Sequence, residues 1–418
     1  MEKIAIVGTG VAGLGCAWQL RHHAEVTLFE KDPRPGGHTN TVDVEEAGQK
    51  LPVDTGFIVF NRVTYPHLCA LFSELGVKDK PAEMSFSVRH DATGLEYNGM
   101  GFNKVFAQRR NLASPRFWSL IRKITKFFRV AKESLGRSGG LSMRDFVEKH
   151  GLGRDFLDLY LVPMSSAVWS TDPSDVLDFP AETLIRFFDN HGFLGVDTHH
   201  RWLTVEGGAR TYLRKILDVV GAPRLAAPVA AVEVGDRQAT VRLADGSACA
   251  FDRVILACHA DQARALLPET DREARELLGN FRYQHNPATL HTWEGVMPRR
   301  RLAWASWNYR VTGEAGQRAK THYWMNALQG VSEKQNYFVS LNSRGEIPAS
   351  HILYETDYEH PVFTRDSVAA QSRLPGLNER SPDQRVFFCG SYFRYGFHED
   401  AYGSAVALTT RLRECLGR

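Results

Sequence analysis

The sequence predicts an α/β protein of two domains, and three observations carry this prediction. The chain has 418 residues, more than one compact core usually holds. A buried strand, a glycine turn, a helix and a second strand follow one another at residues 3–30. Two further apolar strands, at 253–258 and 385–389, can join the first only if distant segments return to one parallel sheet.

The stretch KIAIV at residues 3–7 reads as a short buried strand that ends at glycine. The spacing Gly8, Gly10, Gly13 then gives each glycine a task. Gly8 permits a tight turn, Gly10 lets the backbone approach a pyrophosphate, and Gly13 lets the following helix pack closely on the strand. We expect that helix to run from about Ala12 to Leu20, so that the free N–H groups at its start, including those of Val11 and Ala12, face the phosphates.

A second strand, EVTLFE at residues 25–30, ends on Glu30. A carboxylate at this position can accept hydrogen bonds from the hydroxyls of a ribose. Strand, glycine turn, helix, strand and acid together form the Rossmann fingerprint of a dinucleotide-binding domain.

The loop after Glu30 distinguishes FAD from NAD. It reads KDPRPGGHTNT and resembles the E-x-x-x-R-x-G-G extension of glutathione-reductase-like flavoproteins, a second glycine cluster that simple NAD dehydrogenases lack. The resemblance implies an FAD whose pyrophosphate is approached by Arg34 and by the backbone of Gly36 and Gly37. Three further loop residues are expected at the cofactor: Lys31, His38 and Thr39.

Two segments in the middle of the sequence resemble parts of the flavin amine-oxidase superfamily. LPVDTGFIVFN at 51–61 is similar to its D-x-G segment, which implies that Asp54, Thr55 and Gly56 lie near the flavin. The stretch 227–258 reads as a β-meander with an Asp-Gly turn. In the superfamily, the first strand of such a meander contacts the adenine through its backbone, here at Val229.

The C-terminal stretch 385–408 resembles the last flavin motif of that superfamily: strand, Gly390, loop, and a small-residue helix from about Ala401 whose N-terminus points at the flavin. A partial positive charge there stabilises an anionic reduced flavin. The superfamily usually places an aspartate after the glycine, whereas this chain has Ser391. The acidic pair Glu399 and Asp400 is expected to serve in its place.

These segments imply a discontinuous architecture. We predict a glutathione-reductase-like Rossmann FAD domain from residues 1–80, 200–264 and 376–418, and an amine-oxidase-like α+β substrate domain from 81–199 and 265–375. No recognisable flavin-linking cysteine or histidine context is present, so non-covalent binding is expected.

Longer phrases resemble one group within the superfamily, the FAD-binding oxidoreductases associated with cyclopropane-fatty-acid synthases. The resemblance implies oxidation or desaturation of a fatty-acyl chain, with such a synthase as a partner. It covers nearly the whole chain and includes YPHLCALFSELGV (65–77), PMSSAVWST (163–171), FPAETLIRFFDNHGFL (179–194), RWLTVEGGARTYL (201–213) and GFHEDAYGSA (396–405).

The sequence weighs against oxidation of an amine. Amine oxidases of the superfamily commonly place a lysine near the flavin, but the comparable stretch, 281–298, contains no lysine. A small amine substrate, a redox-neutral fatty-acid isomerase and a non-catalytic flavoprotein partner of the synthase nevertheless stay open. For a dehydrogenase, His398 is the first candidate proton acceptor and Glu399 the second, although His398 can also be a structural histidine in a tight loop.

Residues 104–137 contain ten Lys or Arg and one acid, with apolar residues at helical spacing from Phe117 to Ala131. Such a helix can lie on an anionic membrane, or it can pack its apolar face on the core and expose its basic face. The chain has no run of about 18 apolar residues, which excludes a membrane-spanning helix.

Composition excludes several other classes. A formal charge of +3 is too small to imply nucleic-acid binding. Six scattered cysteines without a C-x-x-C pair predict neither a metal site nor a disulfide framework. With no signal peptide recognised, the expected location is the cytoplasm, with peripheral contact at the inner membrane face.

Overall fold

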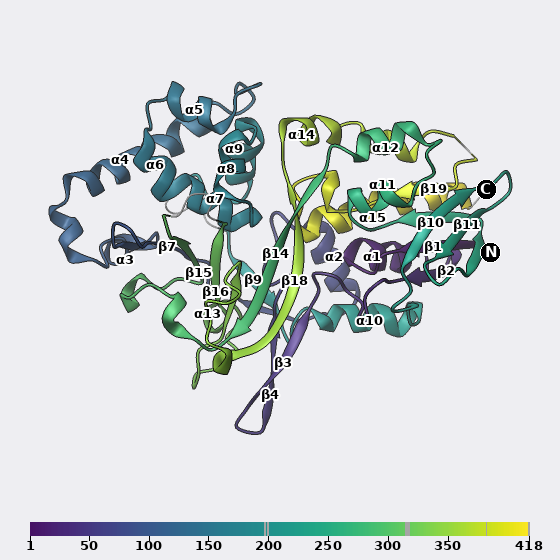
Figure 1. Cartoon of the computed structure of the whole chain (residues 1–418), viewed down its shortest axis with the longest axis horizontal. Coiled ribbons are helices and arrows are strands. Elements are labelled where there is room, and N and C mark those ends of the chain that lie inside the picture. The colour runs from purple at the N-terminus through teal and green to yellow at the C-terminus, as the bar shows by residue number, and fades with distance from the viewer. Residues whose placement is uncertain (196–197, 199, 314–317, 382, 417–418) are drawn as a thin grey trace.

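The computed structural model describes residues 1–195, 198, 200–313, 318–381 and 383–416. Figure 1 shows a region on the right that carries both chain ends, and a region on the left built from helices and a second sheet. Two long strands, β14 (Arg282–His291) and β18 (Ile352–Val362), run between these regions.

The right-hand region is built on a four-stranded parallel sheet with the order β19-β13-β1-β2. All four predicted strands are confirmed. Their bounds are Glu2–Val7 for β1, Ala24–Phe29 for β2, Arg253–Leu256 for β13 and Val386–Phe388 for β19. The sheet therefore joins three segments that lie far apart in the sequence.

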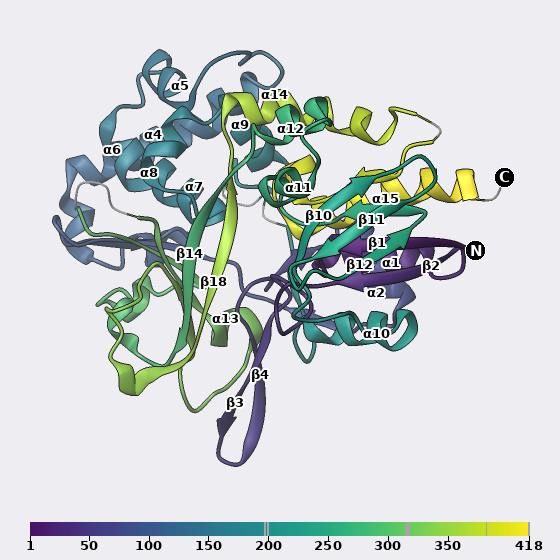
Figure 2. The same cartoon turned by 45° about the vertical axis from the view of Figure 1, so that its right-hand side comes forward.

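Alternate residues of β1 face two different cores. Ile4 and Ile6 pack with helices α1 (Val11–Leu20) and α15 (His398–Leu416), whereas Ala5 and Val7 pack with the meander β10–β12. The meander covers this second face in Figure 2. Its strands are β10 (Val229–Val234), β11 (Ala239–Leu243) and β12 (Ala248–Phe251).

Helix α15 begins three residues before the predicted start at Ala401. The carboxylate of Asp400 accepts the N–H of Phe397 at 2.9 Å, and the Ala401 N–H donates to the Phe397 carbonyl at 3.0 Å. This added turn brings His398 into the helix.

The left-hand region contains a seven-stranded sheet with the order β18-β14-β17-β16-β15-β7-β8, antiparallel except where β15 meets β7. Its strands come from two separate parts of the sequence, 86–98 and 282–362. The remaining bounds are Phe86–His90 for β7, Leu95–Asn98 for β8, Trp307–Val311 for β15, Lys320–Trp324 for β16 and Phe338–Leu341 for β17.

Helices from the stretch between β8 and Asn190 form a layer beside this sheet (Figure 1). Phe127, Phe146 and Phe156 are fully buried at its centre. The helices are α3 (Gly101–Val105), α4 (Pro115–Glu133), α5 (Met143–Lys149), α6 (Arg154–Phe156), α7 (Val162–Trp169), α8 (Pro173–Asp178) and α9 (Ala181–Asn190).

The linking segments pack on the parallel sheet, not on the larger one. Helix α12 (Arg272–Leu278) and helix α14 (Arg365–Gln371) contribute buried residues to the core beneath β1 and β13. The chain therefore passes from one region to the other at β14 and β18. Both strands lie inside the segment 265–375 that was predicted to belong to the substrate domain.

Smaller elements complete the connection between the regions. Strands β3 (Thr41–Glu46) and β4 (Gln49–Asp54) form a hairpin, and β5 (Phe60–Asn61), β9 (Trp202–Val205) and β6 (Asp79–Pro81) form a short sheet. Helices α2 (Pro66–Glu74), α10 (Arg210–Val220) and α13 (Met325–Gln329) share one core with them, whereas α11 (Ala260–Leu266) packs beneath the parallel sheet with the meander.

The predicted basic helix is confirmed as α4, which Ser114 caps by accepting the N–H of Phe117. Its apolar stripe is mostly occupied, because Phe117, Leu120 and Phe127 are buried in the helical core. This stripe is therefore not free to enter a bilayer. None of the helices in the described ranges is long and apolar enough to cross a membrane.

Candidate active site

A cavity of about 1120 Å³ runs from the glycine turn after β1 to helices α3 and α4. The three segments of the parallel sheet meet at its first part, and most of the predicted cofactor residues line it there. These are Gly8, Gly10, Val11, Ala12, Glu30, Lys31, Arg34, Gly36, Gly37, His38, Gly56, Val229, Gly390, Ser391 and Ala401.

The glycine turn has the geometry that its spacing predicts. Gly8 has a φ of +102°, which side chains other than hydrogen rarely tolerate. A Cβ atom on Gly13 would lie 1.9 Å from the Gly8 carbonyl oxygen, whereas a Cβ on Gly10 would meet no atom within 4 Å. Gly13 is thus required for helix packing, and Gly10 leaves open space at the start of the cavity.

Glu30 is held in a fixed orientation at the end of β2. Its buried carboxylate accepts the N–H of Thr9 at 3.0 Å, the Thr9 hydroxyl, and the N–H of Asp32 at 3.1 Å. A carboxylate offers about four lone-pair positions, so acceptor capacity remains for sugar hydroxyls in the cavity.

Arg34 provides the test of whether the cavity suits a dinucleotide. Its Nη1 atom is buried and has no hydrogen-bond partner among the described residues, and the Nε2 atom of His38 is in the same condition. Buried donors without partners are costly, most of all charged ones. A pyrophosphate would satisfy the guanidinium, so the residues present fit FAD.

Several predicted residues lie outside the cavity lining, among them Gly13, Thr39 and Thr55. Asp54 also lies outside the lining, because its side chain is hydrogen-bonded to two other segments of the chain. Its carboxylate accepts the Ala209 N–H at 3.0 Å at the start of α10 and the Gln329 amide at 2.6 Å. Burial raises the pKa of Asp54 to about 6.

The acidic pair at the start of α15 is also turned away. Glu399 accepts the N–H groups of His67 and Leu68, both at 2.9 Å, at the N-terminus of α2. Asp400 holds the turn before α15, and burial raises its pKa to about 7. Neither lines the cavity, and both carboxylates are hydrogen-bonded within the fold, so they do not face a cofactor or substrate there.

His398 lines the cavity beneath the glycine loops. Its ring stacks on Phe57 with centroids 4.0 Å apart, and its Nε2 atom lies 3.2 Å from the hydroxyls of Thr39 and Tyr212. Burial lowers the pKa of His398 to about 3, so the ring is neutral. These contacts fix the ring in place and favour a structural or flavin-supporting role.

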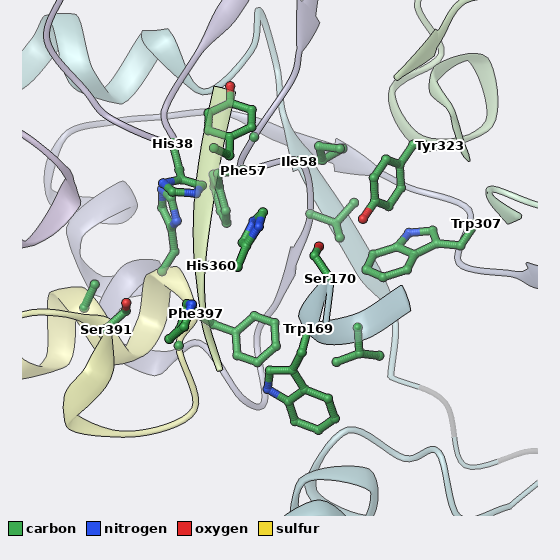
Figure 3. Close-up of a pocket in the computed structure, with 18 of the residues that line it drawn as sticks. His38, Phe57, Ile58, Trp169, Ser170, Trp307, Tyr323, His360, Ser391 and Phe397 are labelled. Carbon is green, nitrogen blue, oxygen red and sulfur yellow. The ribbon is translucent and has the colours of Figure 1, made fainter. Parts of the chain in front are cut away.

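A second imidazole, His360 on β18, projects into the middle of the cavity in Figure 3. Its Nδ1 atom lies 2.9 Å from Asn286 Oδ1, and the Asn286 amide donates to the Ser170 carbonyl at 3.0 Å. The Asn286 amide nitrogen donates to Ser170, so the side that faces His360 is the amide oxygen, which accepts. Nδ1 therefore carries the proton, and Nε2 is an acceptor with no hydrogen-bond partner among the described residues. Burial, with a smaller effect of His259, lowers the pKa of His360 to about 4.

Ser170 ends α7 in a left-handed conformation, with a φ of +53°. Its carbonyl accepts from Asn286 and also from the Gln284 amide at 3.3 Å. A non-glycine residue in this region is strained, and such strain is common at functional sites. Sequence analysis did not identify Ser170 or His360, because their meeting depends on how β14 and β18 pair.

The rest of the cavity is an arm between the helical layer and the seven-stranded sheet. Trp169, Trp307 and Tyr323 surround its inner end (Figure 3). Among the described residues that the helical layer contributes, none is charged. These include Val105, Phe106, Phe117, Trp118, Leu120, Ile121, Ile124, Thr125, Phe128, Tyr160, Met164, Val168, Trp169, Phe187 and His191.

The charged residues of the cavity wall lie elsewhere. They belong to the loop from Glu30 to Arg34 or to β18, where Asp357 and Glu359 face His285 and His259. Lys31, in the loop after β2, is the one lysine among the described residues that line the cavity. Among all the residues that the structure describes, no group of three or more His, Cys, Asp or Glu is arranged to hold a metal ion.

Comparisons with known proteins agree with this arrangement. The family model of flavin containing amine oxidoreductases matches residues 11–293. The carotenoid phi-ring synthase of Chlorobaculum tepidum is 35% identical over 77 residues, which are 18% of this chain and only 12% of that enzyme.

Solved structures resemble the whole chain. Cyclohexylamine oxidase from Brevibacterium oxydans has a TM-score of 0.71 at 15% identity, with all of both chains covered. The CLA-producing fatty acid isomerase from P. acnes has a TM-score of 0.68 at 14% identity, with 98% of each chain covered. At these identities the likeness concerns the fold.

Proposed function

The chain belongs to the flavin-containing amine oxidoreductase family and is an FAD-dependent oxidoreductase, and from this premise we propose that it dehydrogenates a fatty-acyl chain. One observation carries the proposal: the cavity continues from the glycine turn past His360 into a long arm with uncharged walls. A methylene chain suits such an arm, whereas an ammonium group would lose its hydration without gaining a counter-charge.

We propose that the FAD is held without a covalent bond. The turn at Gly10 and the start of α1 would meet the pyrophosphate together with Arg34, and Glu30 would bind the ribose. When bound, FAD supplies an acceptor for the hydride of a substrate C–H bond.

The arm then positions the acyl chain. Trp169, Phe187 and Phe397 surround its inner end close to His360, with Phe187 and Phe397 stacked at 5.1 Å. These rings exclude water and restrict the chain to few conformers, which aligns one C–H bond for transfer.

Loss of a hydride leaves one proton to be removed from the neighbouring carbon before a double bond can form. His360 is the acceptor that we propose, because Asn286 holds its Nε2 lone pair available and its low pKa keeps it neutral near pH 7. The earlier candidate, His398, has its Nε2 atom occupied by two hydroxyls.

The substrate that we propose is an acyl chain carrying a double bond, a methyl branch or a cyclopropane ring, because a methylene beside a double bond, or a methylated or cyclopropanated carbon, is a better hydride donor than a carbon of a plain alkane. Resemblance to the oxidoreductases associated with cyclopropane-fatty-acid synthases supports this choice and makes such a synthase the proposed partner.

Anaerobic addition of unsaturated, methylated or cyclopropanated acyl chains tests the proposal, with loss of the flavin absorbance as the readout. We expect reduction by an acyl chain and not by small amines. Reduction by amines alone would refute it. A shifted double bond without net flavin reduction would instead indicate a redox-neutral isomerase.

Two variants distinguish the role of His360 from that of His398. His360→Gln should slow flavin reduction by about 100-fold or more while FAD affinity stays unchanged. His398→Gln should retain the rate of reduction once FAD is saturating. The reverse result would show that His398, and not His360, accepts the substrate proton.

A further inference from the structure

Four apolar side chains with large exposed fractions gather where the cavity ends at α3 and α4. Phe102 is 64% exposed, Leu112 43%, Met100 40% and Trp118 39%. They are one surface, because the Phe102 and Trp118 rings both pack on Phe106, at 4.6 and 5.0 Å, and the Trp118 indole donates to the Leu112 carbonyl. We call these four residues the apolar tip.

The apolar tip is continuous with the cavity. Met100, Phe102 and Trp118 line the cavity and are exposed to solvent at the same time. Helix α4 lies at the end of the molecule farthest from both chain ends in Figures 1 and 2. An acyl chain that leaves a bilayer at the tip could therefore enter the arm without crossing water.

The charge around the apolar tip is positive. The stretch from Met100 to Lys132 contains no Asp or Glu. Arg109 donates to Asn103 and to the Phe106 carbonyl, and Arg110 donates to the Gly94 carbonyl, so in the described part of the chain both face neutral partners.

A polar recess of about 480 Å³ adjoins the tip, and Arg109 and Arg110 line it together with Arg299 and Arg300. Two carboxylates also border it, but both are already bound. Glu96 accepts the backbone N–H groups of Arg299 and Arg300 at 2.8 and 3.0 Å, which leaves both guanidinium groups outside this contact, and Asp91 pairs with Arg89 and Arg310. The recess thus offers cations to the phosphate of a phospholipid headgroup.

We propose that the apolar tip and its arginines dock the enzyme on an anionic phospholipid membrane, so that the acyl substrate enters the cavity directly from the bilayer. This inference rests on the proposed function for the identity of the substrate. Exposed aromatic side chains beside cations are the combination that binds the interface of an anionic bilayer.

Cosedimentation with vesicles tests docking without any turnover. The holoenzyme should bind vesicles of phosphatidylglycerol and phosphatidylcholine, and bind pure phosphatidylcholine at least about tenfold more weakly. Added salt should release it, because exposed charges are screened.

Variants locate the surface. Phe102→Ser together with Leu112→Ser should weaken binding to anionic vesicles by about tenfold or more. The matched control is Val219→Ser together with Leu353→Ser, which removes apolar residues that are 57% and 46% exposed elsewhere, and should bind as the parent does. Equal losses in both pairs would overturn the proposal.

Two outcomes would exclude a membrane as the occupant. One is an absence of vesicle binding by the parent enzyme. The other is a dimer in sedimentation that the Phe102 and Leu112 changes dissociate, which would make the tip a contact between copies of this chain. If detergent-dispersed acyl substrate still reduces the flavin in either case, docking fails and the proposed function stands.

Discussion

Arg34→Met gives the sharpest test of how the cofactor is held. The Nη1 atom of Arg34 is buried at the cavity with no partner among the described residues, so its hydrogen bond forms only when an anion is present. A hydrogen bond to a charged group contributes about 1.5–3 kcal/mol. At about 1.4 kcal/mol per tenfold change, the Kd for FAD should rise by about 10- to 150-fold.

The same change should leave the cofactor-free protein unharmed, because it removes a buried charged donor that makes no bond there. The Kd is measured by titrating cofactor-free protein with FAD and following flavin fluorescence, and the melting temperature is followed in parallel. Arg62→Met is the matched control, since Arg62 is 64% exposed and pairs with Asp79 at the surface.

Riboflavin distinguishes contact with the pyrophosphate from a general effect on the cavity. It has no phosphate, so Arg34→Met should weaken riboflavin binding by less than about threefold. An FAD affinity within about threefold of the parent, or an equal loss for FAD and riboflavin, would refute the assignment of Arg34 to the pyrophosphate.

Three further predictions concern stability. Gly13→Ala places a Cβ atom 1.9 Å from a carbonyl oxygen and should cost about 3 kcal/mol in urea unfolding, whereas Gly10→Ala, which meets no atom within 4 Å, should cost under about 1 kcal/mol. Ser340→Ala should cost about 2 kcal/mol, because the hydroxyl lies 2.7 Å from ring nitrogens of both His291 and His322; a shift in the urea midpoint measures it. Burial lowers the pKa of His291 to about 3 in the folded chain from an ordinary 6.5, so its contribution is complete above pH 6.5 and is lost as the pH falls. His291→Asn should therefore flatten the loss of unfolding free energy between about pH 7 and about pH 5, by up to about 1.4 kcal/mol per pH unit.

The geometry around the glycine turn could be predicted because neighbouring residues determine it. The tight turn, the helix start and the acid after β2 all lie between Gly8 and Glu30. Each depends on the local backbone, and few alternatives satisfy the same spacing. The two returning strands were also predictable, since short apolar runs next to glycine have few places in a parallel sheet.

The acidic pair at Glu399 and Asp400 shows where local pattern fails. Two carboxylates at the start of a helix suit a ligand near its N-terminus equally well as they suit capping. In the structure, Glu399 caps α2, because it accepts two backbone N–H groups at the start of that helix. That partner lies more than 300 residues away, beyond the reach of any local signal.

His360 shows a further limit. On β18 it is one polar residue in an alternating strand, ILYETDYEHPV, with nothing in the letters to distinguish it from its neighbours. Its place in the cavity follows from pairing with β14, which sets Gln284 opposite it and brings Asn286 within reach of its ring. Strand register of this kind is fixed by the whole sheet.

Helix α4 shows why the apolar stripe of a helix does not by itself predict contact with a membrane. Helical periodicity finds the stripe but cannot say whether a core, a cavity or a bilayer covers it. Here Phe127 faces the core alone, whereas Phe117 and Ile124 also line the cavity. Trp118 is the more informative residue of α4 about a binding surface. It lies beside the stripe, is exposed and also lines the cavity. Trp118 lies in a group of exposed apolar side chains where a cavity opens, and such a patch makes binding the explanation to test first.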